Sequence, residues 1–262
     1  MRIMRTFSIL SFVFLFAIAP GVAQKKLSEG YYEIRTYHLK NEAQEAITDQ
    51  FLKDAFLPAL HRSGIAAAGV FKPIDNDTSA DRRIIVLIPY RSFSEFEQTE
   101  AKLMKDASFQ SNGGAYLNAP FDSVPYKRIE KTLLKNFASG HSAQAPKLSS
   151  PKTERIYELR SYEGPTEKLH AAKVKMFIVG DEISLFKRLG FNAIFYGEVL
   201  AGKSMPNLMY MTSFENIASR DEHWKAFSAD AQWKRISAIP EYDHSVSHSD
   251  IYLLHPTDYS DL

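Results

Sequence analysis

The fold is decided by the stretch Tyr32-Glu33-Ile34-Arg35-Thr36-Tyr37, because the chain repeats it as Tyr157-Glu158-Leu159-Arg160-Ser161-Tyr162, 125 residues further on (157 − 32). Two further matches follow in the same order at nearly the same spacing: residues 57–64 with 183–190, and Asp106-x-x-Phe109 with Asp230-x-x-Trp233. Three ordered matches at nearly one spacing predict two copies of one domain.

A break separates the copies at residues 138–152, which read ASGHSAQAPKLSSPK. Small and polar residues with Pro and Gly, and without apolar periodicity, are typical of an exposed linker. We therefore expect a first domain at 24–137, a linker at 138–152 and a second domain at 153–262.

Each copy reads as strand, helix, strand, strand, helix, strand. In the first copy, Asn41 is expected to cap a helix that Gly64 ends. The apolar face of that helix is expected to carry Ala43, Ile47, Phe51 and Ala55. Ser92 and Glu95 have the spacing of a capping box and open the second helix. The expected strands are 31–39, 65–71, 83–89 and 125–137 in the first copy, and 155–163, 191–199, 207–214 and 245–254 in the second.

This βαββαβ order is the ferredoxin-like unit, an antiparallel sheet with helices on one face. The other face of the sheet also needs cover, because the strands are apolar or aromatic on both sides. Two such units pressing sheet to sheet would bury both open faces. The sequence therefore predicts an α+β protein in which two ferredoxin-like repeats form a pseudo-dimeric α/β barrel.

The first 23 residues have the pattern of a secretory signal peptide. Arg2 and Arg5 supply the positive start, residues 7–19 the short apolar run, and Gly21-Val22-Ala23 the small-residue cleavage site. The run is shorter than the roughly 20 residues of a membrane-spanning helix. We expect cleavage after Ala23, a periplasmic or secreted mature protein, and no transmembrane segment once the signal is removed.

Composition narrows the chemistry and the partners. The chain has no cysteine, which excludes disulfides, thiol nucleophiles and thiolate metal sites. Its 32 basic and 31 acidic residues nearly cancel and form no basic tract, so nucleic-acid binding is not expected. A small-molecule ligand, a protein partner and homo-oligomerisation remain compatible with the sequence.

The strand motif Glu-x-Arg-x-Tyr, at residues 33–37 and 158–162, resembles the first strand of the NIPSNAP family. So do the later helices, which we expect to end in Asp106-x-x-Phe109 and Asp230-x-x-Trp233, and the C-terminal LLHPTDYS at residues 253–260. The resemblance spans nearly all of the mature chain. It implies tandem NIPSNAP domains with the fold of the dimeric α/β-barrel superfamily, which small monooxygenases and isomerases share. It implies no agreed catalytic residues, and a fold alone assigns no reaction.

The repeated strand motif carries the main candidate site. Alternation along a strand places Glu33, Arg35 and Tyr37 on one face, and Glu158, Arg160 and Tyr162 on the corresponding face of the second copy. Because the helix-covered face is expected to take the apolar residues, we expect both trios to point into the space between the sheets.

Two interpretations of the trios stay open. In a ligand pocket, Arg would bind a carboxylate, Tyr would donate a hydrogen bond, and Glu would hold Arg in place or act as a base. In a structural network, the same groups would pair with one another and fix the strand register. The presence of the trio in both copies favours the structural network, because one active site does not require two.

The remaining candidates are weaker. His223 lies beside Trp224 on an expected helix and is a candidate pocket residue, while Trp224 and Trp233 themselves are interpreted as core. His61 is interpreted as a cation in the last turn of a helix. His244 and His248 would lie about 13 Å apart on a strand and have no third ligand of suitable spacing, so neither a metal nor another cofactor is expected.

Three functions remain open. The first is an extracytoplasmic binding protein with little or no catalytic activity, favoured by the export signal and by the lack of an activated nucleophile. The second is a cofactor-free oxygenase or isomerase acting on a small aromatic or carbonyl compound; it rests on analogy with the superfamily and predicts a barrel cavity of at least about 300 Å³. The third is an envelope scaffold that assembles through open sheet edges.

Overall fold

The computed structural model describes residues 30–137 and 146–262. The expected signal peptide at 1–23 lies outside the described residues, as does the first part of the expected linker, 138–145. The elements of the first half are β1 Tyr31–Leu39, α1 Glu42–Phe51, a π-helical segment Leu52–Phe56, α2 Leu57–Ser63, β2 Gly69–Pro73, β3 Arg82–Tyr90, α3 Phe93–Leu103, α4 Ala107–Asn112, α5 Gly114–Leu117 and β4 Arg128–Asn136. Those of the second half are β5 Ile156–Glu163, α6 Glu167–Ile178, α7 Glu182–Arg188, β6 Asn192–Ala201, β7 Asn207–Phe214, α8 Ile217–Ala229, α9 Ala231–Ser237, a 3₁₀ turn Pro240–Tyr242 and β8 His248–Pro256.

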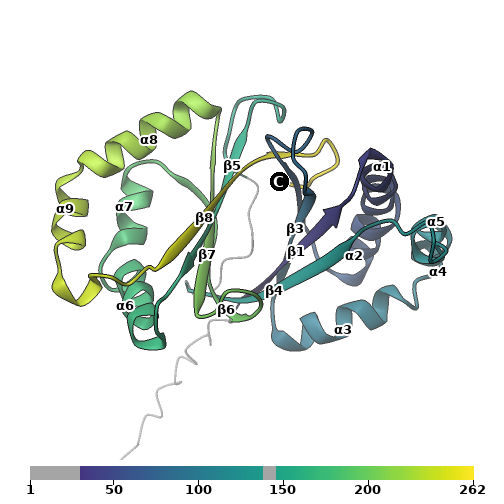
Figure 1. Ribbon diagram of the computed structural model, residues 1–262, viewed down its shortest axis with the longest axis horizontal. Helices are drawn as coiled ribbons and strands as arrows, with labels where there is room; N and C mark the ends of the chain where they lie inside the picture. Colours follow the sequence, from purple (N-terminus) through teal and green to yellow (C-terminus); the bar gives the residue numbers. More distant parts are fainter. Residues whose placement is uncertain (1–29, 138–145) are drawn as a thin grey trace, which may run out of the picture.

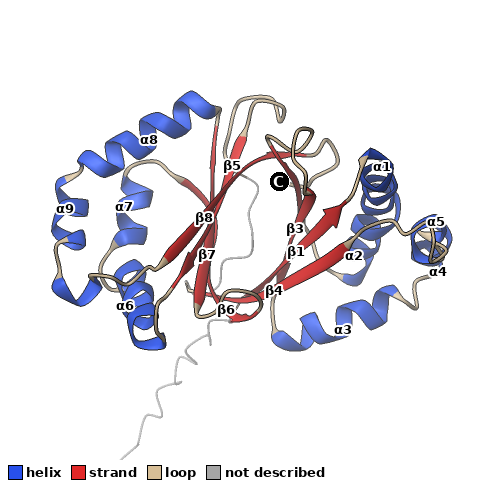
Figure 2. Ribbon diagram, in the orientation of Figure 1, coloured by secondary structure: helices blue, strands red, loops and turns tan. Residues whose placement is uncertain are grey.

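The strands form one closed antiparallel barrel in the order β1-β3-β2-β8-β5-β7-β6-β4. Two seams join the halves, one between β2 and β8 and the other between β4 and β6. The helices lie outside the barrel, with α1–α5 on one side and α6–α9 on the other (Figure 1). Figure 2 shows the same arrangement as two helical layers flanking a central set of strands. The expected α/β barrel is therefore confirmed.

Local signals in the sequence begin and end the helices as expected. The Asn41 side chain accepts a hydrogen bond from the Gln44 backbone N–H at 3.0 Å, and Ser92 accepts one from the Glu95 N–H at 3.1 Å. These caps satisfy backbone donors that have no partner inside the helix. Gly64 ends α2 with φ of 102°, a left-handed conformation that favours glycine.

Two details of the helices differ from expectation. In α1, Ala43 is exposed and the polar Glu45 and Thr48 are buried, because Glu45 pairs with Lys72 and Arg82 across the helix–sheet contact. The expected stripe through Ala43 is therefore wrong at its first position.

The Asp-x-x-aromatic motif was also misplaced in part. Asp106 lies beyond the end of α3, whereas Asp230 directly follows the last residue of α8 as expected; both residues cap the starts of the next helices, α4 and α9, where their carboxylates accept backbone N–H groups. Each aspartate also pairs with an arginine of the same half, Asp106 with Arg62 at 2.7 Å and Asp230 with Arg188 at 2.8 Å. The repeated motif thus supports the same helix junction in both halves.

The barrel interior is filled by apolar and aromatic side chains from both halves, among them Tyr32, Ile34, Phe71, Leu87, Tyr157, Leu159, Phe195 and Met211. Rings from the two halves meet inside the barrel near each seam, with 5.0 Å between the centroids of Tyr32 and Phe195 and 4.7 Å between those of Phe71 and Tyr157. The pocket at one mouth of the barrel measures only about 100 Å³. The barrel cavity that the enzyme hypothesis predicted is therefore not found there.

The expected orientation of the strand trios is wrong. Ile34 packs inside the barrel, whereas Tyr37 packs against the helical layer with Phe51 and Leu52. The polar side chains of the barrel interior gather at one mouth, so a charged group in the apolar remainder would lack a partner, and an unpaired buried charge is strongly unfavourable. Between sheet and helices, the helices supply polar partners, so the Glu and Arg side chains face that layer.

Within the described residues, no helix has both the length and the apolar character needed to cross a membrane.

Candidate functional site

In the first half, the trio forms a buried ion network. Glu33 accepts hydrogen bonds from Arg35 Nε at 2.7 Å and from the Tyr90 hydroxyl at 3.1 Å. Arg35 also pairs with Glu100 of α3 at 3.2 Å and lies 5.0 Å from the ring centre of Phe56. Glu33 is 1% exposed and Arg35 7% exposed. Each charge here has an opposite charge in contact, which is the structural network that the repeat favoured.

In the second half, Glu158 is held by four donors. Its carboxylate accepts from Arg160 Nε at 2.5 Å, from Arg220 Nε and Nη2 at 2.7 and 3.1 Å, and from the Trp224 indole at 2.8 Å. Burial opposes ionisation of this carboxyl, but the hydrogen bonds from Arg220 and Trp224 and the charge of Arg160 outweigh it, so its pKa lies below the usual value. Glu158 is therefore an anchor for the surrounding cations.

Arg160 extends from that anchor toward a pair of tyrosines. Its Nη1 donates to the Tyr162 hydroxyl at 2.9 Å, and that hydroxyl lies 2.9 Å from the hydroxyl of Tyr210 on β7. The guanidinium stacks on Trp224 at 3.7 Å from the ring centre. Among the described residues its Nη2 has no hydrogen-bond acceptor, which leaves one strong donor available.

A second buried pair lies beside the tyrosines. Lys173 of α6 donates to Glu182 of α7 at 2.9 Å, and the two side chains are 7% and 3% exposed. The ammonium lies within 6 Å of the ring centres of Tyr162, Phe177 and Trp233. Burial raises the pKa of Glu182, and the nearby charges of Lys173 and Arg160 reduce but do not cancel this shift.

These groups line a pocket of about 330 Å³ between the sheet and the helices of the second half. Its lining residues are Arg160, Tyr162, Lys173, Glu182, Tyr210, Arg220, Trp224, Phe227, Ser228 and Trp233. Both tryptophans of the chain are among them. A pocket of this size with aromatic walls and a few converging polar groups is typical of a small-molecule site.

The two halves differ at the positions that make this pocket polar. The helix-ending glycines, Gly64 and Gly190, are 126 residues apart (190 − 64), which aligns Glu182 with Phe56. The capping residues of α3 and α8 are 124 residues apart (216 − 92), which aligns Trp224 with Glu100. The first half therefore has an aromatic ring where the second has a buried carboxylate.

Sequence reasoning found only part of this site. It selected Arg160 and Tyr162, which line the pocket, and Glu158, which anchors it, but it missed Lys173, Glu182 and Arg220. These residues could have been found by comparing the two halves position by position. A charged residue at a position that is apolar in the other half has to be paired or functional. Trp224 and Trp233, interpreted as core, form part of the pocket wall.

The histidines lie elsewhere. His223 does not line this pocket; its Nδ1 lies 2.6 Å from the Ser219 carbonyl, and its ring packs on Phe191 and Phe214. His61, in the last turn of α2, lies 2.8 Å from the Asp261 carboxylate. Neither histidine contacts the Glu-Arg-Tyr groups.

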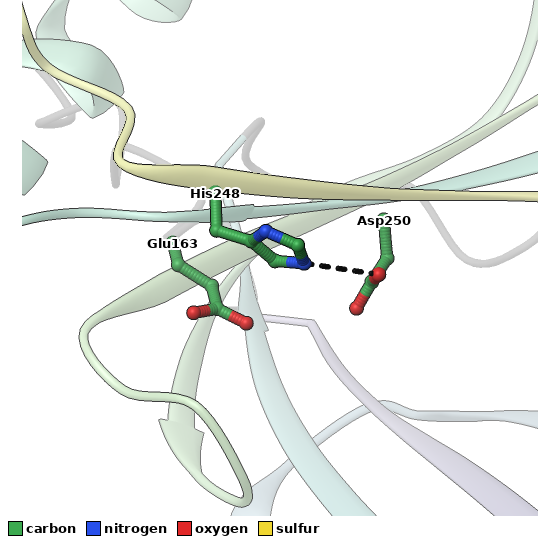
Figure 3. A group of neighbouring side chains, drawn as sticks. All are labelled: Glu163, His248 and Asp250. Carbon is green, nitrogen blue, oxygen red and sulfur yellow. Dashed lines mark hydrogen bonds and ion pairs between the residues drawn. The ribbon is translucent and has the colours of Figure 1, made fainter.

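One cluster has metal-binding residue types. Glu163 of β5 is paired in register with His248 of β8, and Asp250 follows on the same face, so that ligand atoms of all three lie within 4.8 Å of one another (Figure 3). The cluster does not include His244; the pairing of the distant strands β5 and β8 brings Glu163 to His248, a contact that spacing along the sequence could not indicate. All three side chains are at least partly exposed, and the 3.2 Å contact between His248 and Asp250 is an ordinary surface ion pair.

Comparison with known proteins agrees with this fold. Residues 157–261 match the NIPSNAP family model. No curated protein matches the sequence. Among solved structures, a provisionally named monooxygenase from Fusobacterium nucleatum is similar with a TM-score of 0.58 and 7% identity, covering 87% of this chain and 93% of the other. A provisionally named monooxygenase from Lactobacillus acidophilus has a TM-score of 0.53 and 12% identity, covering 87% and 94%.

A NIPSNAP family protein from Agrobacterium tumefaciens matches with 22% identity, a TM-score of 0.37, and coverage of 45% of this chain and 98% of its own. Identities this low compare folds and carry no reaction across.

Proposed function

Since residues 157–261 place this chain in the NIPSNAP family, we propose that it binds a small molecule in the pocket between the sheet and the helices of its second half. The observation that carries the proposal is the convergence of Arg160, Lys173 and Glu182 with two tryptophans on one space of about 330 Å³. Buried charged groups that are not needed for the fold are concentrated at functional sites. The first half shows that the fold forms with Phe56 in place of the carboxylate.

The repeat architecture supports the same proposal. In each half the strands follow the order fourth, first, third, second, as β4-β1-β3-β2 and β8-β5-β7-β6. That order is the one expected of two ferredoxin-like repeats, here domains 24–137 and 153–262 joined by 138–152. On this basis one repeat serves mainly as the structural partner that closes the barrel, and the other holds the ligand.

The N-terminal signal pattern adds the location. With residues 1–23 removed, the binding protein acts in the periplasm or outside the cell. A binding role there requires no cofactor, and the ligand site lies within a single chain.

Native mass spectrometry of residues 24–262, compared with the denatured chain, tests the proposal. A reproducible extra mass in the native state is the expected result. Ser228→Phe would fill the pocket and is expected to remove that mass, whereas Ala226→Phe, at an exposed position of the same helix outside the pocket, should retain it. A bare chain in the wild type, with no binding of any compound from a small-molecule library, would refute the proposal.

A second candidate is proton-transfer chemistry of the oxygenase or isomerase type at the same pocket. It is favoured by the raised pKa of Glu182, which buried acids and bases in enzymes often show. Turnover of a carbonyl compound by the wild type that is lost in Glu182→Gln, with ligand binding retained, would support this candidate over simple binding.

A further inference from the structure

The charged groups of the second-half pocket do not cancel. Three cations, Arg160, Lys173 and Arg220, contact or line it, against two carboxylates, Glu158 and Glu182. Their formal sum is +1 (3 − 2). Protonation of Glu182, toward which burial shifts its pKa, would increase the positive charge further. The pocket is therefore positive whichever state Glu182 adopts.

Among the described residues, one further carboxylate contacts these cations, and it lies on the solvent side. Asp221 accepts from Arg220 Nη1 at 2.9 Å, but its side chain is 62% exposed. Exposed ion pairs are weakened by water and salt, so Asp221 does little to lower the potential inside the pocket.

The first half provides the matched comparison. There Glu33 and Glu100 face Arg35 and Lys131, two charges of each sign, and the network is closed. Among the buried groups, the excess of cations is therefore confined to the second half, where Arg220 is completed by the 62% exposed Asp221. An anion inside the pocket would compensate these buried cations better than an exposed carboxylate does.

The walls define the rest of the ligand. Trp224, Trp233 and Phe227 line the pocket beside the ring faces of Tyr162 and Tyr210. Aromatic side chains favour a flat, apolar ligand body through edge and face contacts. Arg160 Nη2 is available to a planar acceptor, and guanidinium groups match the geometry of a carboxylate.

We propose that the ligand of this pocket is a small aromatic carboxylate, whose carboxylate meets Arg160 and Arg220 and whose ring lies among the tryptophans. The proposal rests on the proposed function, since it names the class of molecule that the same pocket binds. A bare inorganic anion would satisfy the charge but leave the aromatic walls without a partner. A cationic ligand would oppose all three cations.

Three probes separate these features: benzoate, benzamide and acetate. Because both tryptophans of the chain line the pocket, intrinsic fluorescence reports on it directly, and calorimetry gives the affinity. Benzoate is expected to bind at least about tenfold more tightly than benzamide, which has the same shape without the charge, and than acetate, which has the charge without the ring. Equal affinity for benzoate and benzamide would overturn the inference and leave the proposed function intact. If neither the three probes nor any library compound binds, both the inference and the proposed function are refuted.

Variants test the source of the selectivity. Arg220→Gln should weaken benzoate binding at least about tenfold, whereas Lys175→Gln, which removes a cation from the same region outside the pocket, should change it less than about twofold. Asp221→Asn removes an exposed carboxylate that pairs with Arg220 outside the pocket, so it should retain or tighten binding, which a general loss of folding cannot do. A loss in Asp221→Asn as large as that in Arg220→Gln, or equal losses in Arg220→Gln and Lys175→Gln, would contradict the charge argument.

Discussion

Replacing Lys173 by methionine tests whether the buried pair of the second half is held together as the structure shows. The change removes the ammonium and leaves the Glu182 carboxyl, 3% exposed, without its partner. Removing one member of a buried ion pair typically destabilises a protein by about 3–5 kcal/mol, because the remaining charge is desolvated and unpaired. With about 2–4 °C per kcal/mol for a protein of this size, the melting temperature should fall by roughly 6–20 °C.

The assay is guanidinium unfolding followed by circular dichroism, with thermal melting as a second measure. Lys175→Met is the matched control, because Lys175 lies on the same helix and pairs with Glu241 at the surface, the two side chains being 48% and 49% exposed. Its midpoint should be nearly unchanged, since water screens exposed pairs. The double variant Lys173→Met/Glu182→Leu should recover most of the loss, because a well-packed apolar pair replaces a buried ion pair at little cost.

The pH dependence of the same variant has a defined sign. Burial raises the pKa of Glu182 above its ordinary value of 4.5, so the folded protein holds this proton more tightly than the unfolded chain. That contribution to stability is complete below the ordinary pKa and is lost as pH rises through the raised one. Without Lys173 the pKa of Glu182 rises further, so Lys173→Met should lose stability more steeply than the wild type as pH rises above the ordinary glutamate pKa. A loss below about 1 kcal/mol, or a double variant no more stable than the single one, would refute the reasoning.

Three further predictions follow from other parts of the molecule. Gly64→Ala should destabilise the protein by about 1–2 kcal/mol in chemical denaturation, because φ at Gly64 is 102°. Gly114→Ala is the control and should be neutral or slightly stabilising, because the nearest atom to an added Cβ is 3.8 Å away. The Glu215 carboxylate accepts backbone N–H groups of the linker end, and these hydrogen bonds lower its pKa to about 2. The contribution of this carboxylate to stability is therefore present above the ordinary glutamate pKa and is lost as pH falls through about 2. An NMR titration of the Glu215 carboxyl that gives an ordinary pKa would contradict this contact. Protein exported by its native host should begin at Gln24, and an intact mass that includes residues 1–23 would show that the signal pattern is not cleaved.

Much of the fold was accessible from the sequence because its signals are local. Asn41 and Ser92 cap helices through groups three residues away, and Gly64 and Gly190 end them by backbone conformation alone. The order of strands and helices follows from patterns within single segments. The repeat then implied that the two halves share one architecture, and the closed barrel is consistent with that implication.

The candidate site was less accessible because it depends on contacts between distant segments. Lys173 and Glu182 come from two helices, and Arg220 reaches Glu158 from 62 residues away. Nothing in the neighbourhood of Glu158 along the chain indicates that Arg220 and Trp224 would complete its coordination. Likewise, Glu163 and His248 become neighbours only through the pairing of β5 with β8.

The sequence by itself predicted an α/β barrel built from two halves and placed a Glu-Arg-Tyr trio on one face of the first strand of each half. Strand alternation separates two faces but does not say which of them meets the helices. Only the tertiary structure decided that question. Closing the barrel removes water from its interior, so the apolar Ile34 face packs there, and Arg35 and Arg160 turn to the layer where helices provide partners. In the first half those partners balance the charge, and in the second they leave a positive, aromatic-walled pocket.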